Sequence, residues 1–223
     1  MNTEKVIIGS LQPGDRIEFG RINSAPLIWL IGEKNHKGFP DDSVNIVTED
    51  TIGNMTFSPA NPIDTIMKRR LYGNNRYSMS LARTYLNSDT FLHTVFTDED
   101  IAAILRTDVK TKVLEIDKGR LDTCHDHLFL LSASEVCLEE EDEEGSAIEL
   151  FKNREMLKVR DINGDHDWWW LRSALMSNPF HVRNVDSVGR ADSNAACNGN
   201  RGLRPACNLA ANYQVSLIRG GNR

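Results

Sequence analysis

The sequence predicts an α+β fold with helices in the middle of the chain and short strands toward both ends. β-branched and alternating apolar runs, bounded by Gly, Pro, Asn and Asp, occur before residue 50 and after residue 168. Between these regions, apolar residues recur at the helical spacing of three and four. Neither an internal repeat nor a Pro- and Ser-rich linker divides the chain, so we expect one compact domain over residues 1–223.

The N-terminal part is expected to form antiparallel strands joined by turns. The motif LQPGD (11–15) places proline and glycine at the centre of a type II turn, and an alternating strand follows at 16–20. The apolar run at 25–33 predicts a buried strand that pairs with the β-branched segment 43–50. Residues 53–77 are rich in Gly, Asn and Pro and predict a long irregular segment.

Two helices are predicted next. The segment 78–89 carries apolar residues on one helical face, namely Leu81, Ala82, Tyr85 and Leu86. In the segment 97–107, Thr97 can cap the helix and Asp100, three residues later, can complete a capping box. The buried stripe of this second helix is expected to comprise Ile101, Ile104 and Leu105.

The remaining third returns to strands. Residues 127–131 predict a buried strand that leads into a short third helix, capped by Ser132 or Ser134. Five further strand segments are separated by turn residues, which predicts a compact antiparallel meander. These segments are 168–173, 180–186, 189–197, 202–210 and 213–218.

Charge is distributed unevenly along the chain. The net charge is −6, and the run EEEDEE (139–144) accounts for all of it, so the loop 139–145 is expected to be a solvated tip. From residue 168 onward there are seven arginines and no lysine. Arginine without lysine favours planar, bidentate contacts over a general electrostatic field of positive charge. This composition argues against a nucleic-acid surface. The sequence contains no full secretory signal and no apolar run that could span a bilayer, so we expect a cytoplasmic protein without membrane insertion.

Three consecutive tryptophans, Trp168 to Trp170, precede Leu171 and Arg172. On a strand their side chains alternate between two faces, and we expect most of them to be core residues. A functional alternative is that Trp168 or Trp170 reaches a surface groove. Arg172 on a buried strand must satisfy five N–H donors, so it is expected to organise the interior with backbone carbonyls or a carboxylate.

No catalytic residues are predicted, because the phosphate-loop, dinucleotide and nucleophile-elbow motifs are missing from the sequence. Two weak metal candidates remain. The segment around Cys124, His125 and His127 could supply part of a metal site, although polar residues at a strand entrance are the favoured explanation. A loop-type Ca²⁺ site could use the alternating oxygen ligands Asp161, Asn163, Asp165 and Asp167, against the alternative of a polar turn. The prediction is therefore no cofactor, with Ca²⁺ as a weak possibility.

Three C-terminal motifs carry a resemblance. WWLRS (169–173), then VRNVDSVG (182–189), then GLRPACNL (202–209) resembles the signature W-W-L-R-S … V … G … G-V-R-P-A of a bacterial and prophage family of unknown function. In this signature the structural positions correspond to Trp169, Trp170, Arg172, Arg204 and Pro205.

The resemblance extends upstream. RIEFG (16–20) and PLIWLI (26–31) resemble the opening of that family, and the segments 82–104 and 127–136 resemble its helical part and its F-L-L-S motif. The landmarks occur in order over about residues 16–209. The family is similar to the C-type-lectin-like fold of formylglycine-generating enzymes and of the variable proteins of diversity-generating retroelements. The resemblance therefore implies a C-type-lectin-like domain with small antiparallel sheets and two to three helices.

Formylglycine-generating enzymes use a closely spaced cysteine pair that binds copper, and this chain departs from that pattern. Cys197 and Cys207 are separated by nine residues, so the activity is not carried over. These two cysteines could form a disulfide in an oxidising compartment, although reduced thiols are the default without a signal peptide.

The resemblance points instead to a recognition surface in the C-terminal half. In lectin-like binders the corresponding region presents the ligand-facing loops, and here it is rich in Asn, Ser, Asp and Arg, which suit adaptable hydrogen bonding. Simple turn geometry is the alternative explanation for the Asn and Gly residues. The candidate ligand-binding residues are His181, Arg183, Asn184, Asp186, Arg190, Asp192, Asn194, Asn198 and Asn200.

The leading functional hypothesis is a non-enzymatic binding module of bacterial or prophage origin that contacts a protein or glycan. The first alternative is a structural virion-associated protein, such as a tail or decoration subunit, that self-assembles and leaves the cell in a phage particle. The second alternative is a metal-dependent enzyme of the formylglycine-generating type. A homo-oligomer is compatible with either of the first two hypotheses.

Overall fold

The computed structural model describes residues 2–219, and its strands form one large sheet and three small ones. The strands are β1 (Asn2–Ile7), β2 (Arg16–Ile22), β3 (Ala25–Lys34), β4 (Ser43–Thr48), β5 (Ile104–Leu105), β6 (Thr107–Lys112), β7 (Leu121–Asp126), β8 (Val159–Arg160), β9 (His166–Asp167), β10 (Trp169–Ala174), β11 (His181–Val185), β12 (Ala191–Ala195), β13 (Ala206–Ala210) and β14 (Gln214–Arg219). The α-helices are α1 (Met67–Tyr72), α2 (Leu81–Leu86), α3 (Asp89–Val95) and α4 (Asp98–Ala103). The 3-10 helices are η1 (Ile8–Ser10), η2 (Tyr77–Met79), η3 (Glu115–Asp117), η4 (Glu149–Lys152) and η5 (Arg154–Leu157).

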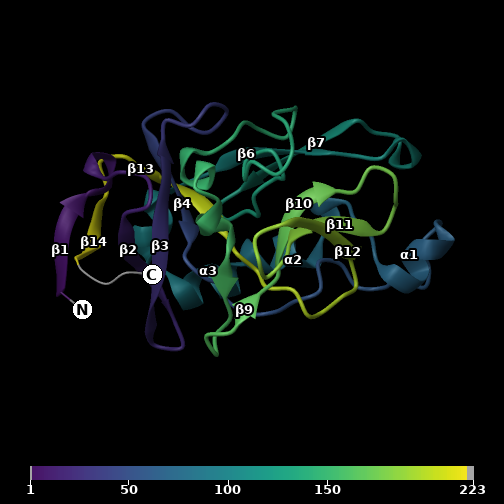
Figure 1. The fold of residues 1–223 in the computed structure, drawn as a ribbon, viewed down its shortest axis with the longest axis horizontal. Helices are drawn as coiled ribbons and strands as arrows, with labels where there is room; N and C mark the ends of the chain where they lie inside the picture. Colours follow the sequence, from purple (N-terminus) through teal and green to yellow (C-terminus); the bar gives the residue numbers. More distant parts are fainter. Residues whose placement is uncertain (1, 220–223) are drawn as a thin grey trace.

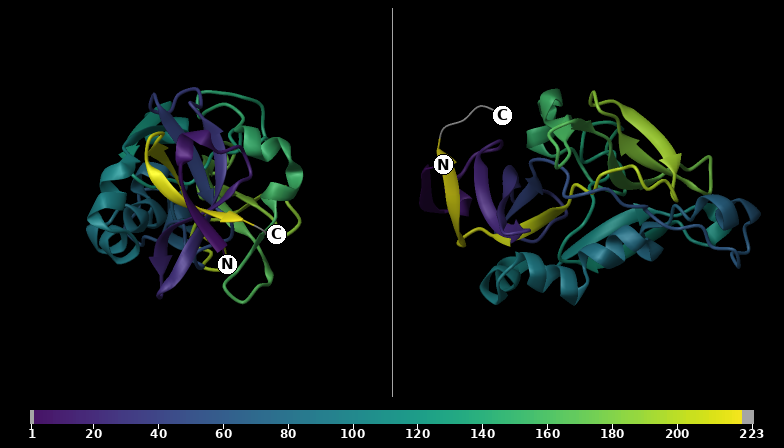
Figure 2. Two further views of the ribbon diagram at one scale, coloured as in Figure 1. Left: turned by 90° about the vertical axis from the view of Figure 1, so that its left-hand side faces the viewer. Right: turned by 90° about the horizontal axis from the view of Figure 1, so that it is seen from below.

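The large sheet is antiparallel throughout, with seven strands in the order β1-β14-β2-β3-β4-β13-β5. The three small sheets are the meander β10-β11-β12 and the hairpins β6–β7 and β8–β9. The large sheet occupies one end of the molecule, and β10–β12 and α1 extend toward the other end (Figure 1). The helices of the middle of the chain lie along one side (Figure 2). The mixed α+β composition and the small antiparallel sheets that the sequence predicts are therefore confirmed.

The centre of the large sheet holds a chain of polar bonds. All six residues of β4 are buried between β3 and β13. Asn45 lies opposite Asn208, and Asn45 Nδ2 donates to Asn208 Oδ1 at 3.2 Å. Asn208 Nδ2 in turn donates to Thr107 Oγ1 at 2.8 Å. Because buried amides need partners, these bonds favour the observed register of β4 against β13 over a one-residue slip.

Each predicted C-terminal strand exists, but the predicted single meander is wrong. Of the five predicted C-terminal strands, all within residues 2–219, only β10, β11 and β12 pair with their neighbours in sequence order. β13 inserts between β4 and β5, and β14 inserts between β1 and β2. Alternation identifies a strand without identifying its neighbours, because any edge with a complementary apolar face can accept it.

The N-terminal predictions agree more closely with the structure. Gly14 has φ +91°, and Asp15 N donates to Gln12 O, as a type II turn requires. β2, β3 and β4 pair in sequence order, as expected for this segment. The segment 53–77 is not wholly irregular, however, because it contains α1.

The helices are shorter and more numerous than predicted. Thr97 and Asp100 form the predicted capping box at α4, but α4 ends at Ala103. Ile104 and Leu105 belong to β5, which pairs with β13, so sheet pairing overrides the helical periodicity there. In α2, Ala82 and Leu86 are buried as predicted, whereas Leu81 and Tyr85 are exposed. α3, which follows the cap residue Ser88, was missed.

Residues 128–136 are buried, but the segment 127–140 forms neither the predicted strand nor the predicted helix. Phe129 makes an isolated bridge to Ala206, and the chain then winds through turns from Ala133 to Cys137. Ser132 N donates to the carboxylate of Glu135 at 2.9 Å. This turn conformation directs Glu135 toward the interior, which a helix capped at Ser132 would not require.

Candidate functional site

The consecutive tryptophans lie where β10 crosses the core. Trp169 and Trp170 have no exposed surface, and all six residues of β10 are buried. Each indole finds a carbonyl partner: Trp169 Nε1 donates to Leu157 O at 2.9 Å, and Trp170 Nε1 donates to Met55 O at 2.8 Å. The prediction that these two residues are core residues is confirmed, and the hypothesis that Trp170 reaches a groove is wrong. Trp168, which precedes the strand, is half-buried.

Arg172 organises the interior as the sequence predicts. Its Nη1 and Nη2 donate to the two carboxylate oxygens of Glu135 at 2.6 and 2.7 Å. The other donors reach the carbonyls of Lys110 (3.1 Å), Leu130 (2.9 Å) and Glu144 (2.5 Å). All five N–H groups of the guanidinium are therefore engaged inside the protein. With Arg172 and Glu135 each 1% exposed, the pair is a buried bidentate ion pair.

The acidic run folds onto this ion pair, so the prediction of a fully solvated loop tip is wrong. Glu144 is 5% exposed, and its carboxylate accepts hydrogen bonds from Lys112 N and Ser173 Oγ. The neighbouring Asp142 forms an ion pair with Lys112 at 2.5 Å. Only part of the run, including Glu139 to Glu141, stays exposed. Charge runs look solvated in sequence because their partners, here backbone N–H and hydroxyl groups, carry no sequence signal.

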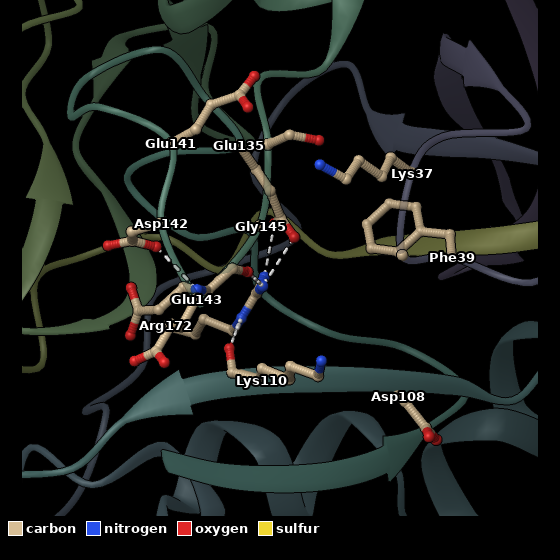
Figure 3. Close-up of a pocket in the computed structure, with 13 residues that line it drawn as sticks. Lys37, Phe39, Asp108, Lys110, Glu135, Glu141, Asp142, Glu143, Gly145 and Arg172 are labelled. Atoms are coloured by element: carbon tan, nitrogen blue, oxygen red, sulfur yellow. Dashed lines mark hydrogen bonds and ion pairs between the residues drawn. The ribbon is translucent and has the colours of Figure 1, made fainter. Parts of the chain in front are cut away.

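A cavity of about 210 Å³ opens above the ion pair (Figure 3). Arg172 and Glu135 form its floor, and Lys37 and Lys110 approach from opposite sides with the ring of Phe39 between them. Every N–H donor of Arg172 is engaged inside the protein, so among residues 2–219 a small molecule in the cavity would contact rim groups such as the ammonium groups of Lys37 and Lys110. The cavity can accept a small polar molecule at its rim, and its floor serves the fold.

Burial gives Glu144 a pH-dependent contribution to stability. Desolvation raises the pKa of Glu144 above its usual 4.5, opposed by hydrogen bonds from Ser173 and Lys112 and by the charge of Arg172. An acid whose pKa is raised by folding loses stability as pH rises from its unfolded pKa through its folded pKa. We therefore expect the Glu144→Gln variant to gain stability relative to the wild type over that window, starting near pH 4.5.

The measurement is a series of urea denaturation curves of both proteins between pH 4 and pH 8, a range that includes the usual glutamate pKa of 4.5. Glu141→Gln is the matched control, because Glu141 is exposed in the same run. A stability difference between wild type and Glu144→Gln that stays constant with pH would contradict the assignment.

Arg204 is the second buried arginine of the C-terminal half. Its guanidinium lies 4.8 Å from the ring centroid of Trp169 and donates to Thr48 O at 2.9 Å and Met156 O at 2.7 Å. It thereby connects β4 of the large sheet to η5 and to the tryptophan strand. Pro205 follows it, and its carbonyl accepts from Thr48 N. Both residues are fully or almost fully buried, which places them in the framework as expected.

Two of the predicted ligand-binding residues, Arg183 and Asp186, make contacts within the fold, and a third, Asn184, is buried. Arg183 forms an ion pair with Glu139 of the acidic run. Asp186 closes the β11–β12 turn, where its carboxylate accepts from Val188 N and Arg190 N. Asn184 is fully buried between Trp170 and Asp192, and neither side-chain amide atom has a hydrogen-bond partner among the residues that the structure describes.

Three other predicted residues are brought together near Trp168. They are Asp192 and Asn194 of β12 and Asn198 of the loop that follows it. Asp192 and Asn194 lie two residues apart on this strand, so their side chains share a face. Asn194 Oδ1 accepts from Asn198 Nδ2 at 3.0 Å. At the other end, the Arg201 guanidinium stacks 4.3 Å above the ring of Trp168. Trp168, Asp192, Asn194, Asn198 and Arg201 are all half-buried, and we call these five residues the Trp168–Asn198 row.

Electrostatics links the two ends of the row. Burial lowers the pKa of Arg201, and the carboxylates of Asp192 and Asp167 oppose that shift. Asp192 therefore lies close enough to Arg201 to interact with it across the row. Arg201 itself was not among the predicted residues. The only signal in the sequence is its position in the Asn- and Gly-rich loop, which alone does not distinguish it from Arg190.

The remaining predicted residues flank the row. His181 Nδ1 lies 3.3 Å from Ser193 Oγ on the opposite face of the hairpin, and burial lowers its pKa. Arg190 is exposed in the turn, and Asn200 is exposed between Asn198 and Arg201. The structure thus divides the predicted surface into a connected row and separate neighbours.

The predicted Ca²⁺ ligands do not converge. Asp161 uses its carboxylate to close a turn, accepting from Asn163 N and Asp165 N. Asp167 is buried elsewhere and accepts from Thr51 Oγ1 at 2.9 Å. Across residues 2–219, no group of three or more His, Cys, Asp or Glu side chains is arranged to hold a metal ion. This arrangement favours the alternative of a polar turn.

The residues around β7 separate in the same way. Cys124 is buried, whereas His125 on the opposite face pairs with Asp108 at the surface. His127 lies beyond the end of the strand, and burial lowers its pKa. The partial metal site that was considered for these residues is not formed.

The four cysteines are free. Cys207 is fully buried in β13, and burial raises the pKa of its thiol well above the usual value. Cys197 lies next to the C-terminal end of α1, where its N–H donates to Tyr72 O. A disulfide between Cys197 and Cys207 is therefore not present, and the two thiols belong to different parts of the fold.

Among residues 2–219, no helix is both long enough and apolar enough to cross a bilayer. Comparison with known proteins found no match among curated proteins and none among solved structures. One family model matches residues 43–211, which run from the first residue of β4 to just beyond β13. This match covers more than half of the chain, includes β10 and the Trp168–Asn198 row, and carries the description "domain of unknown function". The chain therefore belongs to the family of this domain of unknown function, DUF6273.

Proposed function

We propose that this protein is a non-enzymatic recognition module that binds a protein or a glycan through the Trp168–Asn198 row. The observation that carries the proposal is the grouping of an indole, a guanidinium, a carboxylate and two amides at β12 and the loop that follows it. A C-type-lectin-like architecture, in which loops of the C-terminal half meet the ligand, is part of the same proposal.

The chemistry of the row suits binding better than catalysis. Trp and Arg are the residues that most often dominate binding energy, and Asn and Asp provide directional hydrogen bonds. The stacked pair of Arg201 and Trp168 is preorganised, which lowers the entropic cost of binding. The row offers no nucleophile next to a base, whereas acyl or phosphoryl transfer would need one or a comparable activated group.

The rigid elements beneath the row support this role. Asp192 is paired with Asn184 of β11, and Asn184 is paired with Trp170 of β10. The row therefore rests on a three-stranded sheet whose innermost strand is a buried part of the core. A binding surface on such a sheet keeps its geometry better than one on a free loop.

The test is a direct binding screen followed by variants. The purified protein is screened on a glycan array and against displayed surface proteins, and the affinity for each binder is measured by biolayer interferometry. We expect the Asp192→Ala/Asn194→Ala double variant to lose affinity by about 30- to 1,000-fold, since two hot-spot side chains at roughly 1–2 kcal/mol each total about 2–4 kcal/mol.

The control is Asp41→Ala/Asn212→Ala, which removes the same two chemical groups from exposed positions near β1 and β13. Thermal melts of both variants show whether the fold is intact. If every binder found retains its affinity for the row variant, the row is not the recognition surface. Assembly of the purified protein into particles seen by electron microscopy would favour the virion-associated alternative instead.

A further inference from the structure

Helix α1 projects from one end of the molecule and exposes apolar side chains. Ile63 is 88% exposed, Met67 75% and Leu71 63%. In the figures, α1 lies at the opposite end of the long axis from β1 and β14 (Figures 1 and 2). Monomeric proteins expose single apolar side chains commonly, but a group of large ones on a projecting helix indicates a contact surface.

The helical geometry arranges these residues as a stripe with cations on both sides. Met67 and Leu71 are four residues apart, so they share one face of α1. With about 100° between successive residues, Lys68 lies on one flank of that stripe and Arg70 on the other. We call Ile63, Met67, Lys68, Arg70 and Leu71 together the α1 tip.

The opposite face of α1 fixes the helix to the body of the protein. Arg69 is 2% exposed and forms a bidentate ion pair with Asp117, at 2.5 and 2.7 Å. Arg69 Nε also donates to Pro179 O at 2.7 Å, and Tyr72 stacks on Phe180 with ring centroids 4.8 Å apart. The exposed stripe is therefore held in place by a buried anchor and is not a frayed turn.

The charge of the α1 tip selects an acidic partner. Lys68 lies over the ring of Phe180 at 5.6 Å, and Arg70 Nε donates to the Asp64 carbonyl at 2.7 Å. Neither cation has a carboxylate ion-pair partner among the residues that the structure describes. The nearby carboxylate of Asp64 accepts instead from Ile66 N.

These charges also argue against a second copy of the chain as the partner. A two-fold interface would place Lys68 and Arg70 of one copy against the same cations of the other. An apolar stripe between cations on a projecting end matches the interface of an anionic bilayer, where apolar side chains enter the acyl boundary and the cations reach phosphate groups. The cavity beside the tip is lined by polar residues such as Asn61 and Thr84 together with the exposed apolar side chains of Met79 and Leu81.

We propose that the α1 tip docks this protein on anionic phospholipid surfaces. Ile63, Met67 and Leu71 enter the headgroup region, and Lys68 and Arg70 bind lipid phosphates. The contact is peripheral and uses no membrane-spanning segment. The tip shares no residue with the Trp168–Asn198 row.

The test is co-sedimentation of the full chain with sucrose-loaded vesicles. Vesicles of phosphatidylcholine with about 30% phosphatidylglycerol are compared with vesicles of phosphatidylcholine alone, because anionic lipid attracts basic segments at the surface. We expect binding to the anionic vesicles that weakens several-fold when salt is raised to about 0.5 M, where charges are screened beyond a few ångströms.

Three variants make the result specific. Met67→Ser/Leu71→Ser should reduce partitioning about 10-fold, since each removes buried apolar surface at the interface. Lys68→Glu/Arg70→Glu should abolish the preference for anionic vesicles. The matched control is Ile162→Ser/Val188→Ser, which removes two apolar side chains that are 78% and 53% exposed away from α1 and should bind as the wild type.

Because the substituted side chains are exposed, all variants should melt at the wild-type temperature. Absence of binding to anionic vesicles would overturn the proposal, and so would equal binding by the serine variant or equal loss in the control. Binding of the tip to an acidic protein in place of vesicles would likewise overturn it. The Asp192→Ala/Asn194→Ala variant should bind vesicles normally, so failure of the recognition proposal leaves this one intact.

Discussion

Replacing Arg172 with methionine is expected to destabilise the protein by about 3–5 kcal/mol, the cost of leaving a buried charge without its partner. Glu135 would keep a carboxylate that is 1% exposed, and the carbonyls of Lys110, Leu130 and Glu144 would lose their donor. At roughly 2–4 °C per kcal/mol for a chain of this size, the melting temperature should fall by about 6–20 °C.

The control for this prediction is the double variant Arg172→Met/Glu135→Leu. If the ion pair is the cause, the double variant should be less destabilised than the sum of the two single variants, because no unpaired charge remains. Differential scanning calorimetry of the four proteins completes the cycle. Additive effects of the two substitutions would show that the packing of each side chain, and not their pairing, stabilises the fold.

Replacing Arg204 with lysine is expected to cost about 2–4 kcal/mol although the charge is kept, because each buried carbonyl left without a donor costs roughly 1–3 kcal/mol. Lysine has no planar fork, so it cannot reach Thr48 O and Met156 O while also stacking on Trp169. Urea denaturation followed by tryptophan fluorescence measures the loss directly, since the variant also changes the environment of Trp169.

Arg201 provides a matched control on the same stretch of chain. It too stacks on a tryptophan, Trp168, but it is half-buried and donates a hydrogen bond to the adjacent Asn200 carbonyl. We expect Arg201→Lys to change the unfolding free energy by less than about 0.5 kcal/mol, as is usual at partly exposed sites. A loss as large as that of Arg204→Lys would show that stacking on an indole, and not the buried carbonyls, is the stabilising interaction.

Local features of the fold could be predicted from the sequence, and long-range pairing could not. The capping box of Thr97 and the turn at Gly14 are set by neighbouring residues, and both were found as predicted. Ile104 follows helical periodicity equally well but joins β5, because its pairing with Leu209 of β13 outweighs a weak local propensity. Information about that pairing is spread over residues that are far apart in the chain.

The same division applies to the interior arginine. The sequence predicts that Arg172 must meet five acceptors, because a buried strand provides no water. It does not identify Glu135, which lies 37 residues earlier in a segment whose pattern predicts a helix. Nor does it show that Glu144 folds inward, since a run of six acidic residues looks solvated when its partners are backbone groups.

The candidate recognition surface was predicted in part. Composition alone points to Asp192, Asn194 and Asn198, but it also points to Asp186 and Arg183, whose turn and ion pair serve the fold. Polar residues that close turns and polar residues that face ligands have the same composition. Three-dimensional neighbours separate them, as the contact of Trp168 with Arg201 shows.

The interleaving of the chain ends has a consequence for biosynthesis. β14 completes the sheet between β1 and β2, and β13 completes it between β4 and β5. The strands synthesised early therefore cannot complete their pairing until β13 and β14 have been synthesised. Throughout translation, β2 and β4 each lack a neighbour and expose a strand edge that can pair with other chains. A chain that lacks β13 and β14 would therefore leave the edges of β2 and β4 unpaired and open to association with other chains.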